Sequence, residues 1–504
     1  MPAKPIRRSA LLALALLMAA AVPVRATTPP TFTVVDSIWP GTGSSYGGGS
    51  NDSGAIGDYL YFRAYTETPG WELWRTNGTS TTSVKDINPG EDSSQPQNFT
   101  AFGNFLYFQA NDGTTGDELW RTDGTEAGTT RVKDIRLGPA GSNPNNLAVL
   151  GNFLYFQAND GTTGDELWRT DGTEAGTTRV KDIHVGENGS SPTNFTALGG
   201  FLYFQAADST TGYELWRTNG TEAGTTRVKD INGVGDRYPN EFTALGGFLY
   251  FNAEDGTNGY ELWRTNGTEA GTTRVKDIFV GVGSSGPDYF TAFGDYLYFQ
   301  AADSTAGYEL WRTNGTEAGT TRVKDINLGV DSSYPAHPTA LGDYLYFRAT
   351  DGTTGEELWR TNGTEAGTTR VKDINLLGGD SSWPYNFIAL GDFLYFSAYD
   401  GTDYRIHRTD GTTTERVPFP IDADQSAMCE CAPLTALGGR LYSHVYSEAT
   451  GAEFAYLDEP TYVLPETNRD GGMNSAWTIA LSTLALITLA VGVGLRRRSR
   501  AAQR

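Results

Sequence analysis

The sequence predicts an all-β fold, a β-propeller of about nine four-stranded blades, with eight blades as the alternative. Three observations support this prediction: the tripeptide Glu-Leu-Trp returns every 46 to 48 residues, apolar residues alternate with a period of two, and both faces of the strands are apolar. A long repeat indicates a solenoid or propeller, the period of two indicates strands, and two-sided burial requires stacked sheets. The marker tryptophans are Trp74, Trp120, Trp168, Trp216, Trp263, Trp311 and Trp359.

One repeat, residues 195–231, illustrates the expected blade. Strands are expected at residues 195–198, 201–206, 213–218 and 226–231, and the segments between them are rich in Gly, Asp, Asn and Thr. These residue types favour tight turns because they tolerate positive φ or bond to their own backbone. Each repeat is therefore predicted to form four short antiparallel strands.

The Leu-Tyr pair of the second strand occurs in nine units, although the Glu-Leu-Trp position degenerates in the last two. The pairs begin at Leu60, Leu106, Leu154, Leu202, Leu249, Leu297, Leu345, Leu394 and Leu441. A strand-like segment at residues 34–38 precedes the first unit and would close the ring by pairing with the last blade, with residues 462–464 as a competing segment. An open superhelix is the alternative to a closed ring.

Two apolar segments flank the repeats and predict an extracytoplasmic address. Residues 1–26 have the basic start, apolar run and small-residue cleavage site of a secretory signal peptide. The predicted order continues with a linker containing the closing strand (27–50), the propeller (51–464), a polar stalk (465–475), a transmembrane helix (476–495) and a basic cytoplasmic tail (496–504). Positive residues follow the apolar span, so the repeats are expected outside the cell membrane.

The C-terminal segment resembles a bacterial sorting signal of the glycine-pair type. Gly471 and Gly472 precede the apolar span, and an arginine cluster ends the chain. The resemblance implies cleavage near this pair by a rhomboid-type sorting protease, followed by release or surface attachment. A permanent single-span anchor is the alternative.

Charge and cysteine content narrow the possible partners. The formal net charge is −22, which disfavours nucleic acid and leaves cations, neutral glycans and basic proteins as plausible partners. The only two cysteines are Cys429 and Cys431, so disulfides do not hold the repeats together.

The repeat Glu-Leu-Trp-Arg-Thr-(Asn/Asp)-Gly-Thr-Glu-Ala-Gly-Thr resembles the bacterial ELWxTDGTxxGT family, also described as hyalin-like. It begins at Glu118, Glu166, Glu214, Glu261, Glu309 and Glu357, and the first and last two units depart from it. The resemblance implies a surface or secreted propeller-like protein and brings no established activity, cofactor or catalytic residue.

Recurring polar residues are expected to be structural, because a catalytic constellation is normally built once. Glu214, Arg217 and Asp230 recur in nearly every unit and are predicted to pair as a ladder of ion pairs between neighbouring strands. The turn containing Asp160, Asp165 and Glu166 offers several oxygen ligands that would suit calcium, but it lacks the pattern of an EF-hand loop, so turn chemistry is the preferred interpretation.

Residues that break the repeat are more informative about binding. The loops that leave the fourth strands carry aromatic residues, which would stack on sugars, anchor a protein partner or simply cover their own blades. These residues are Trp39, Tyr238, Tyr289, Tyr334, Trp383 and Tyr385.

A second anomaly lies near the end of the repeats. His407 replaces a marker tryptophan, His444 lies in the next unit, and Cys429 and Cys431 lie between them. These four side chains are ligand types for zinc or copper. Their spacing matches no zinc pattern, and decay of terminal repeats explains them equally well.

These observations favour a membrane-anchored, non-enzymatic binding or adhesion module for a surface glycan or protein, without a cofactor. A propeller-based polysaccharide lyase or hydrolase is the first alternative, and its only visible ionisable cluster is Asp236, Arg237 and His184. A purely structural surface-layer spacer is the second alternative.

Overall fold

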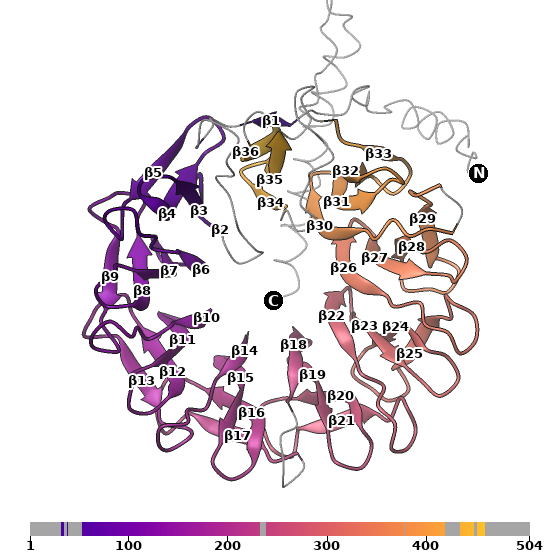
Figure 1. Cartoon of the computed structure of the whole chain (residues 1–504). Coiled ribbons are helices and arrows are strands. Elements are labelled where there is room, and N and C mark those ends of the chain that lie inside the picture. The colour runs from indigo at the N-terminus through magenta and orange to yellow at the C-terminus, as the bar shows by residue number, and fades with distance from the viewer. Residues whose placement is uncertain are drawn as a thin grey trace, which may run out of the picture. The chain divides into compact units, whose positions relative to one another are not determined.

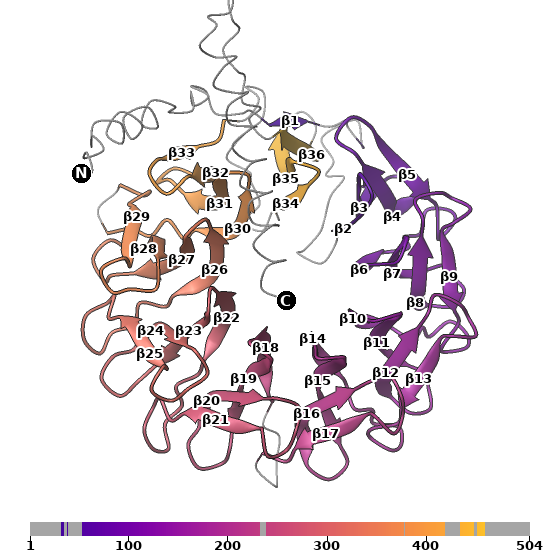
Figure 2. The same cartoon turned by 180° about the vertical axis from the view of Figure 1, so that it is seen from behind.

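The computed structural model describes residues 32–34, 38, 53–231, 238–376, 379–418, 434–447 and 451–458, with the backbone alone at 444–447 and 451–454. All of these residues belong to one compact unit, Pro29–Glu459. Their strands form nine four-stranded sheets, arranged as the blades of a ring (Figure 1; Figure 2 from behind). The prediction of nine blades is confirmed and the alternatives of eight blades and an open superhelix are wrong.

The strands follow the chain blade by blade. Blades 1 to 3 contain β2 (Ser53–Ile56), β3 (Tyr59–Thr66), β4 (Gly70–Thr76), β5 (Thr81–Lys85); β6 (Gln97–Phe102), β7 (Phe105–Asn111), β8 (Asp117–Thr122), β9 (Thr130–Lys133); β10 (Asn145–Leu150), β11 (Phe153–Asn159), β12 (Asp165–Thr170) and β13 (Thr178–Lys181). Blades 4 to 6 contain β14 (Thr193–Leu198), β15 (Phe201–Asp208), β16 (Gly212–Thr218), β17 (Thr226–Lys229); β18 (Asn240–Leu245), β19 (Phe248–Glu254), β20 (Tyr260–Thr265), β21 (Thr273–Lys276); β22 (Asp288–Phe293), β23 (Tyr296–Ala302), β24 (Tyr308–Thr313) and β25 (Thr321–Lys324). Blades 7 to 9 contain β26 (Ala336–Leu341), β27 (Tyr344–Thr350), β28 (Glu356–Thr361), β29 (Thr369–Lys372); β30 (Tyr385–Leu390), β31 (Phe393–Tyr399), β32 (Tyr404–Thr409), β33 (Thr414–Arg416); and β34 (Thr435–Leu437), β35 (Arg440–Ser447) and β36 (Gly451–Asp458).

The ninth blade joins the two ends of the repeat region. Its fourth strand is β1 (Thr33–Val34), which pairs antiparallel with β36 through Thr33 opposite Tyr456. Arg440 Nη1 donates to the Asn77 carbonyl oxygen at 2.6 Å and thereby links blade 9 to blade 1. The predicted ring closure by the N-terminal segment is therefore confirmed, and β1 overlaps the predicted residues 34–38 at Val34. Residues 35–37 and the competing segment 462–464 lie outside the described residues.

The hydrophobic core lies between the blades. Between blades 2 and 3, for example, Tyr107 and Leu119 pack against Leu154, Phe156 and Trp168, all of which are nearly or fully buried. Equivalent clusters separate the other neighbouring blades. Both faces of each sheet are covered, which explains why the strands are apolar at successive positions.

The glutamate of the repeat is a buried anchor for the loop that leaves its blade. Glu309 is fully buried, and its carboxylate accepts hydrogen bonds from the Ile326 N–H at 2.8 Å, the Ser333 N–H at 3.1 Å and the Ser333 hydroxyl at 2.7 Å. Burial raises its pKa to about 7, although the bonds from Ile326 and Ser333 oppose this shift. The corresponding glutamates of blades 3 and 5, Glu166 and Glu261, make the same contacts.

The ladder predicted for Glu214, Arg217 and Asp230 is replaced by separate contacts. Glu214 accepts a hydrogen bond from the Ile231 N–H, and the Arg217 guanidinium lies 4.4 Å from the centroid of the ring of Phe201 in its own blade. Asp230 pairs with Arg227 at 3.6 Å. The three residues do not form one ladder because they lie at different depths. Glu214 is buried inside the sheet stack, whereas the Arg217 and Asp230 side chains lie nearer the solvent.

The predicted signal peptide, linker, stalk, membrane span and tail lie almost entirely outside the described residues. In the part of the chain that is described, no helix is long and apolar enough to cross a membrane.

Candidate binding site on the loop face and the axial wall

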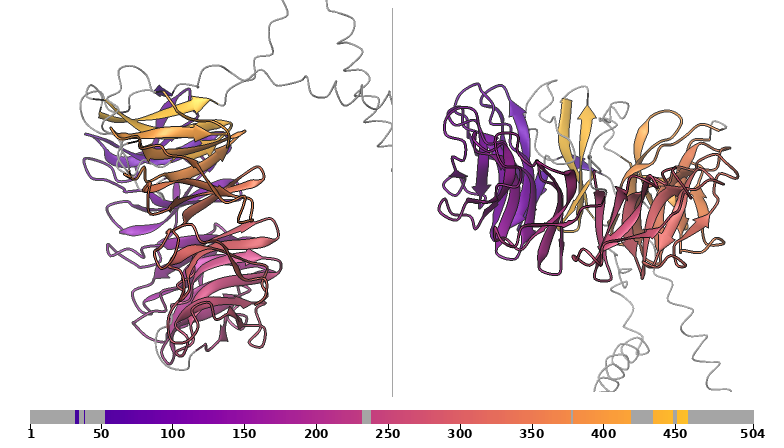
Figure 3. Two further views of the ribbon diagram at one scale, coloured as in Figure 1. Left: turned by 90° about the vertical axis from the view of Figure 1, so that its right-hand side faces the viewer. Right: turned by 90° about the horizontal axis from the view of Figure 1, so that it is seen from below.

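The loops that connect successive blades and the turns between second and third strands gather at one face of the ring, here called the loop face. Gly116, in the turn between β7 and β8, lies against Pro139 and Gly141 of the loop between blades 2 and 3. The first strand of each blade lies nearest the ring axis, and these strands together form what is here called the axial wall (Figure 1). Figure 3 shows the ring from the side and from below. Loop face and axial wall meet where each loop enters its next blade.

Exposed aliphatic side chains are concentrated on the loop face. Leu137 is 85% exposed and Val282 is 91% exposed, and both lie in loops that connect blades. The other members of this group are Val185, Val280, Leu328, Val330 and Leu376. Exposed apolar side chains gathered on one face of a protein are typical of an interaction surface.

Seven of the connecting loops, those that enter blades 2 to 8, end in the same strained step before a proline. In the loops that lead into blades 2 to 8, the residue before the proline has a φ between 39° and 52°. The residues are Gln95, Asn143, Ser191, Tyr238, Gly286, Tyr334 and Trp383. Positive φ is uncommon for bulky residues. A proline restricts the backbone of the residue that precedes it still further.

Three of these strained positions carry large aromatic rings that remain open to solvent. Tyr238 is 45% exposed and its ring lies 5.1 Å from that of Tyr213 in a stacked arrangement. Tyr334 is 51% exposed and stacks on Tyr308 at 6.0 Å. Trp383 is 43% exposed, and its ring lies 6.5 Å from that of Tyr399 in a tilted arrangement. Each exposed ring is thus supported from one side and presents area on the other, as a stacking platform does.

A second strained position lies three residues further on, at a bulge in the axial strand. There φ is between 54° and 60° in seven blades, at Asn98, Asn146, Asn194, Glu241, Tyr289, His337 and Asn386. Asparagine tolerates this backbone better than most residues do. Blades 5, 6 and 7 instead carry Glu241, Tyr289 and His337, although their backbone is the same.

These three unusual residues lie side by side on the axial wall. The Glu241 carboxyl is in hydrogen-bonding contact with Asp288 of the next blade, and burial followed by the charge of Asp288 raises the pKa of Glu241. The Tyr289 ring contacts the His337 ring edge to face at 5.2 Å. Burial, followed by the nearby charge of Arg348, lowers the pKa of His337, so its imidazole is neutral at neutral pH.

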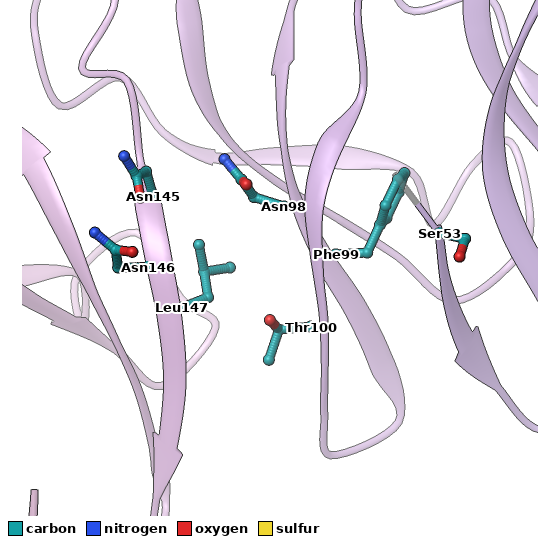
Figure 4. A pocket seen from close by; sticks show the side chains of 7 residues that line it. All are labelled: Ser53, Asn98, Phe99, Thr100, Asn145, Asn146 and Leu147. Atoms are coloured by element: carbon teal, nitrogen blue, oxygen red, sulfur yellow. The ribbon is translucent and has the colours of Figure 1, made fainter. Parts of the chain in front are cut away.

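Two hollows open between neighbouring axial strands. One, of about 300 Å³, lies between β6 and β10 and is lined by Asn98, Thr100, Asn145 and Asn146, with Ser53, Phe99 and Leu147 nearby (Figure 4). The other, of about 370 Å³, lies between β26 and β30 and is lined by His337, Pro338, Thr339, Tyr385, Asn386 and Phe387. The first is mainly polar, whereas the second combines rings with an amide and a hydroxyl.

The structure separates the six predicted aromatic residues into two groups. Tyr238, Tyr334 and Trp383 lie on the loop face as expected, whereas Tyr289 and Tyr385 belong to the axial strands β22 and β30. Trp39 lies outside the described residues. The sequence therefore identified the blades that carry these aromatic residues, which are here called the aromatic sector. It did not separate the residues of the loop face from those of the axial strands.

The turn predicted as a calcium alternative uses its oxygen atoms within the protein. Asp160 Oδ1 accepts hydrogen bonds from Thr162 and Thr163, and Asp160 Oδ2 lies 3.3 Å from Arg179 Nη1. Asp165 accepts from Asn159, and the buried Glu166 accepts from the loop that follows its blade. In this structure the oxygens of the turn therefore form hydrogen bonds and an ion pair within the protein.

Of the four predicted zinc or copper residues, only His407 has a described side chain. His407 is 5% exposed, its Nδ1 lies 3.1 Å from the Arg405 carbonyl oxygen, and its ring stacks on Phe396; burial lowers its pKa to about 4. Cys429 and Cys431 lie outside the described residues, and only the backbone of His444 is described. The described residues contain no group of three or more His, Cys, Asp and Glu suited to a metal.

Sequence reasoning named Tyr289 and Tyr385 but missed Glu241, Asp288 and His337 as site residues of the axial wall. Asp236 and Arg237, proposed as part of an ionisable cluster, lie outside the described residues, and His184 lies in a different loop with its N–H bonded to Glu166. On the axial wall, Asp288 contacts Glu241, and its charge also acts on His337. A comparison of the repeats at the second residue after each loop proline would have revealed Glu241 and His337, because blades 2, 3, 4 and 8 carry asparagine there.

The described unit is a nine-bladed β-propeller whose loop face carries exposed aliphatic and aromatic side chains. No family model and no curated protein matches the chain. Among solved structures it is similar to the computationally designed Ika8 protein, with 13% identity, a TM-score of 0.40, and coverage of 83% of this chain and 99% of the other. It is also similar to a puromycin hydrolase (14%, TM-score 0.36, coverage 74% and 62%) and to prolyl endopeptidases (14%, TM-score 0.38, coverage 70% and 54%). The chain therefore spans less than two thirds of those hydrolases, and such distant likenesses carry no argument about activity.

Proposed function

We propose that this chain is a non-enzymatic binding module of the cell surface whose loop face binds a glycan through Tyr238, Tyr334 and Trp383. The propeller would be held at the membrane by the segment 476–495, or be released after processing near Gly471 and Gly472. The resemblance of the repeats to the ELWxTDGTxxGT family supports the location at the cell surface.

One observation carries the proposal: nearly identical repeats place bulky aromatic rings at a backbone position that disfavours them. Blades 2, 3 and 4 are entered through Gln95, Asn143 and Ser191 at similar φ values. An unfavourable conformation of this kind costs about 1–3 kcal/mol, and such strain is concentrated at functional sites. The rings of Tyr238, Tyr334 and Trp383 are 43–51% exposed, so burial does not compensate for this cost.

The chemistry of the sector favours a glycan. Supported aromatic rings stack on the apolar faces of sugars, and a net charge of −22 disfavours acidic ligands. A protein partner would instead use the exposed aliphatic side chains around the whole loop face, such as Leu137 and Val282. The test therefore separates these two groups of side chains.

The test is binding of the purified full chain to an array of neutral, cationic and anionic oligosaccharides, followed by the repeat-exchange variants Tyr334→Asn and Trp383→Asn. We expect each variant to lose at least about tenfold in affinity, roughly 1.4 kcal/mol, without a fall in Tm. Leu137→Ser is the matched control and should bind glycan normally.

Three results would contradict the proposal. Absence of glycan binding by the unaltered chain would refute the glycan ligand and direct the search to proteins. Equal binding by the aromatic variants would remove the loop-face sector from the site. Shortening of a bound oligosaccharide, detected by mass spectrometry, would favour the hydrolase or lyase alternative, for which Glu241, Asp288 and His337 are the ionisable residues at hand.

A further inference from the structure

We infer that the hollow between β26 and β30 is an inner subsite that takes one uncharged sugar unit of a glycan bound at Tyr334 and Trp383. This inference rests on the proposed function and names the part of the ligand that enters the axial wall. The hollow is lined by His337, Thr339, Tyr385 and Asn386, together with Pro338 and Phe387.

The position of the hollow places it within reach of the aromatic platforms. His337 follows Tyr334 by three residues, and Asn386 follows Trp383 by three residues. Three residues span at most about 11 Å of extended chain. The two neighbouring loops that present the exposed rings therefore lead into the two strands that enclose the hollow, so one short oligosaccharide would contact both.

The size and lining of the hollow suit a sugar. Its volume of about 370 Å³ lies at the small end of the range for ligand pockets. The rings of His337 and Tyr385 supply stacking area, and Asn386 and Thr339 supply an amide and a hydroxyl. A neutral imidazole has one donor and one acceptor nitrogen, which matches a sugar hydroxyl that both donates and accepts.

The charge pattern around the hollow favours an uncharged unit. Its lining includes no carboxylate and no cation. Arg348, whose charge acts on His337, is paired with Glu356 at 3.0 Å, while Asp288 and Glu241 lie on the side away from β30. An acidic sugar would meet the field of these carboxylates, and an amino sugar would find no partner for its ammonium inside the hollow.

The identity of the bulge residue also requires an explanation beyond packing. The same bulge carries Asn98, Asn146, Asn194 and Asn386 in other blades, at nearly the same φ as the 55° of His337. Both asparagine and histidine adopt this left-handed conformation more often than most residues do, so the backbone alone does not select histidine at position 337. Its neighbour Thr339 lies on the same strand and also lines the hollow.

The experiment uses the full chain and five named probes: maltotriose, cellotriose, tri-N-acetylchitotriose, the fully de-N-acetylated chitosan trimer and trigalacturonate. Affinities are measured by calorimetry for the unaltered chain, His337→Asn, Thr339→Val and the control Val149→Thr, a half-exposed residue on the axial strand β10. We expect at least one neutral trisaccharide to bind more tightly than both charged probes. His337→Asn and Thr339→Val should each weaken it about tenfold, while Val149→Thr does not.

The outcomes distinguish this inference from the proposed function. If the neutral trisaccharide binds His337→Asn and Thr339→Val normally but fails to bind Trp383→Asn, the loop-face site stands and the inner subsite is refuted. Tighter binding of either charged trimer refutes the uncharged class. If no probe binds the unaltered chain, both proposals fail. If His337→Asn binds more weakly while its Tm is at or above that of the unaltered chain, a role of His337 in packing alone is excluded. If His337→Asn does not fold, the affinity of Thr339→Val decides whether the inner subsite exists.

Discussion

The hydroxyl of Ser333 donates a 2.7 Å hydrogen bond to the buried carboxylate of Glu309, and this bond joins the third strand of blade 6 to the loop that enters blade 7. Ser333 immediately precedes Tyr334, so the contact fixes the strained step that presents an exposed ring. The repeated glutamate of the sequence is thus a support of the loop face, placed once in each of seven blades.

We predict that Glu309→Gln destabilises the propeller and weakens glycan binding at Tyr334. The amide would present an N–H₂ group to donors that now bond to a carboxylate, and an unsatisfied buried polar group costs about 1–3 kcal/mol. Chemical denaturation should show this loss. The control Glu317→Gln, an exposed residue in the turn after β24, should change stability by less than about 0.5 kcal/mol.

We predict that stability falls as the pH rises from about 5 to about 8. Burial raises the pKa of several of the repeated glutamates from the usual 4.5 to about 7, namely Glu72, Glu214, Glu309 and Glu357. The folded chain therefore holds more protons than the unfolded chain between these values, and its added stability is present below pH 4.5 and lost as the pH rises through 7.

Two other groups limit this pH window. The lowered pKa values of His337 and His407 act in the opposite sense, but two histidines are fewer than the four glutamates. The turn aspartates, such as Asp160, have lowered pKa values and lose their contribution as the pH falls below 3.8. Thermal melts at constant ionic strength should give a higher Tm at pH 5 than at pH 8, and a Tm that rises over this interval would contradict the prediction.

We predict that two glycines with positive φ respond differently to alanine. Gly220, at φ 90°, would place a Cβ against the Tyr155 hydroxyl of the preceding blade, whereas Gly199, at φ 58°, has open space around it. Gly199→Ala should cost about 1 kcal/mol from backbone strain alone, and Gly220→Ala should cost at least about 1 kcal/mol more because the blades must separate. Equal losses of unfolding free energy would show that the contact between the blades contributes nothing.

We predict that Phe32→Ala loosens the ring at its closure. Phe32 is 1% exposed and packs with Tyr395, Ile406, Leu441 and Leu457 between blades 8 and 9. Removal of a buried phenylalanine side chain typically costs about 3–5 kcal/mol. Hydrogen exchange should become faster first in β35 and β36, and uniform exchange across all nine blades would argue against closure by the N-terminal segment.

The repeat could be recognised from the sequence because its information is local. Glu-Leu-Trp, the turn residues and the alternation of apolar residues occur within a single blade, so strands such as 201–206 were expected close to the observed Phe201–Asp208. The aromatic sector was also visible, since Tyr334 and Trp383 interrupt otherwise regular loops. The roles of Glu214, Arg217 and Asp230 were mistaken because their depth in the sheet stack is not a local property.

The sequence by itself determined the blade: its four strands, its two apolar faces and the count of nine units that needed a strand from the N-terminal side to close the ring. Only the tertiary structure decided which polar residues meet. Glu241 and Asp288 contact each other from different blades, as do Tyr289 and His337, although 47 or 48 residues separate the members of each pair. The physical reason is that a periodic pattern specifies each sheet through local geometry, whereas the bulge and ring curvature that bring neighbouring axial strands together arise only when the blades pack.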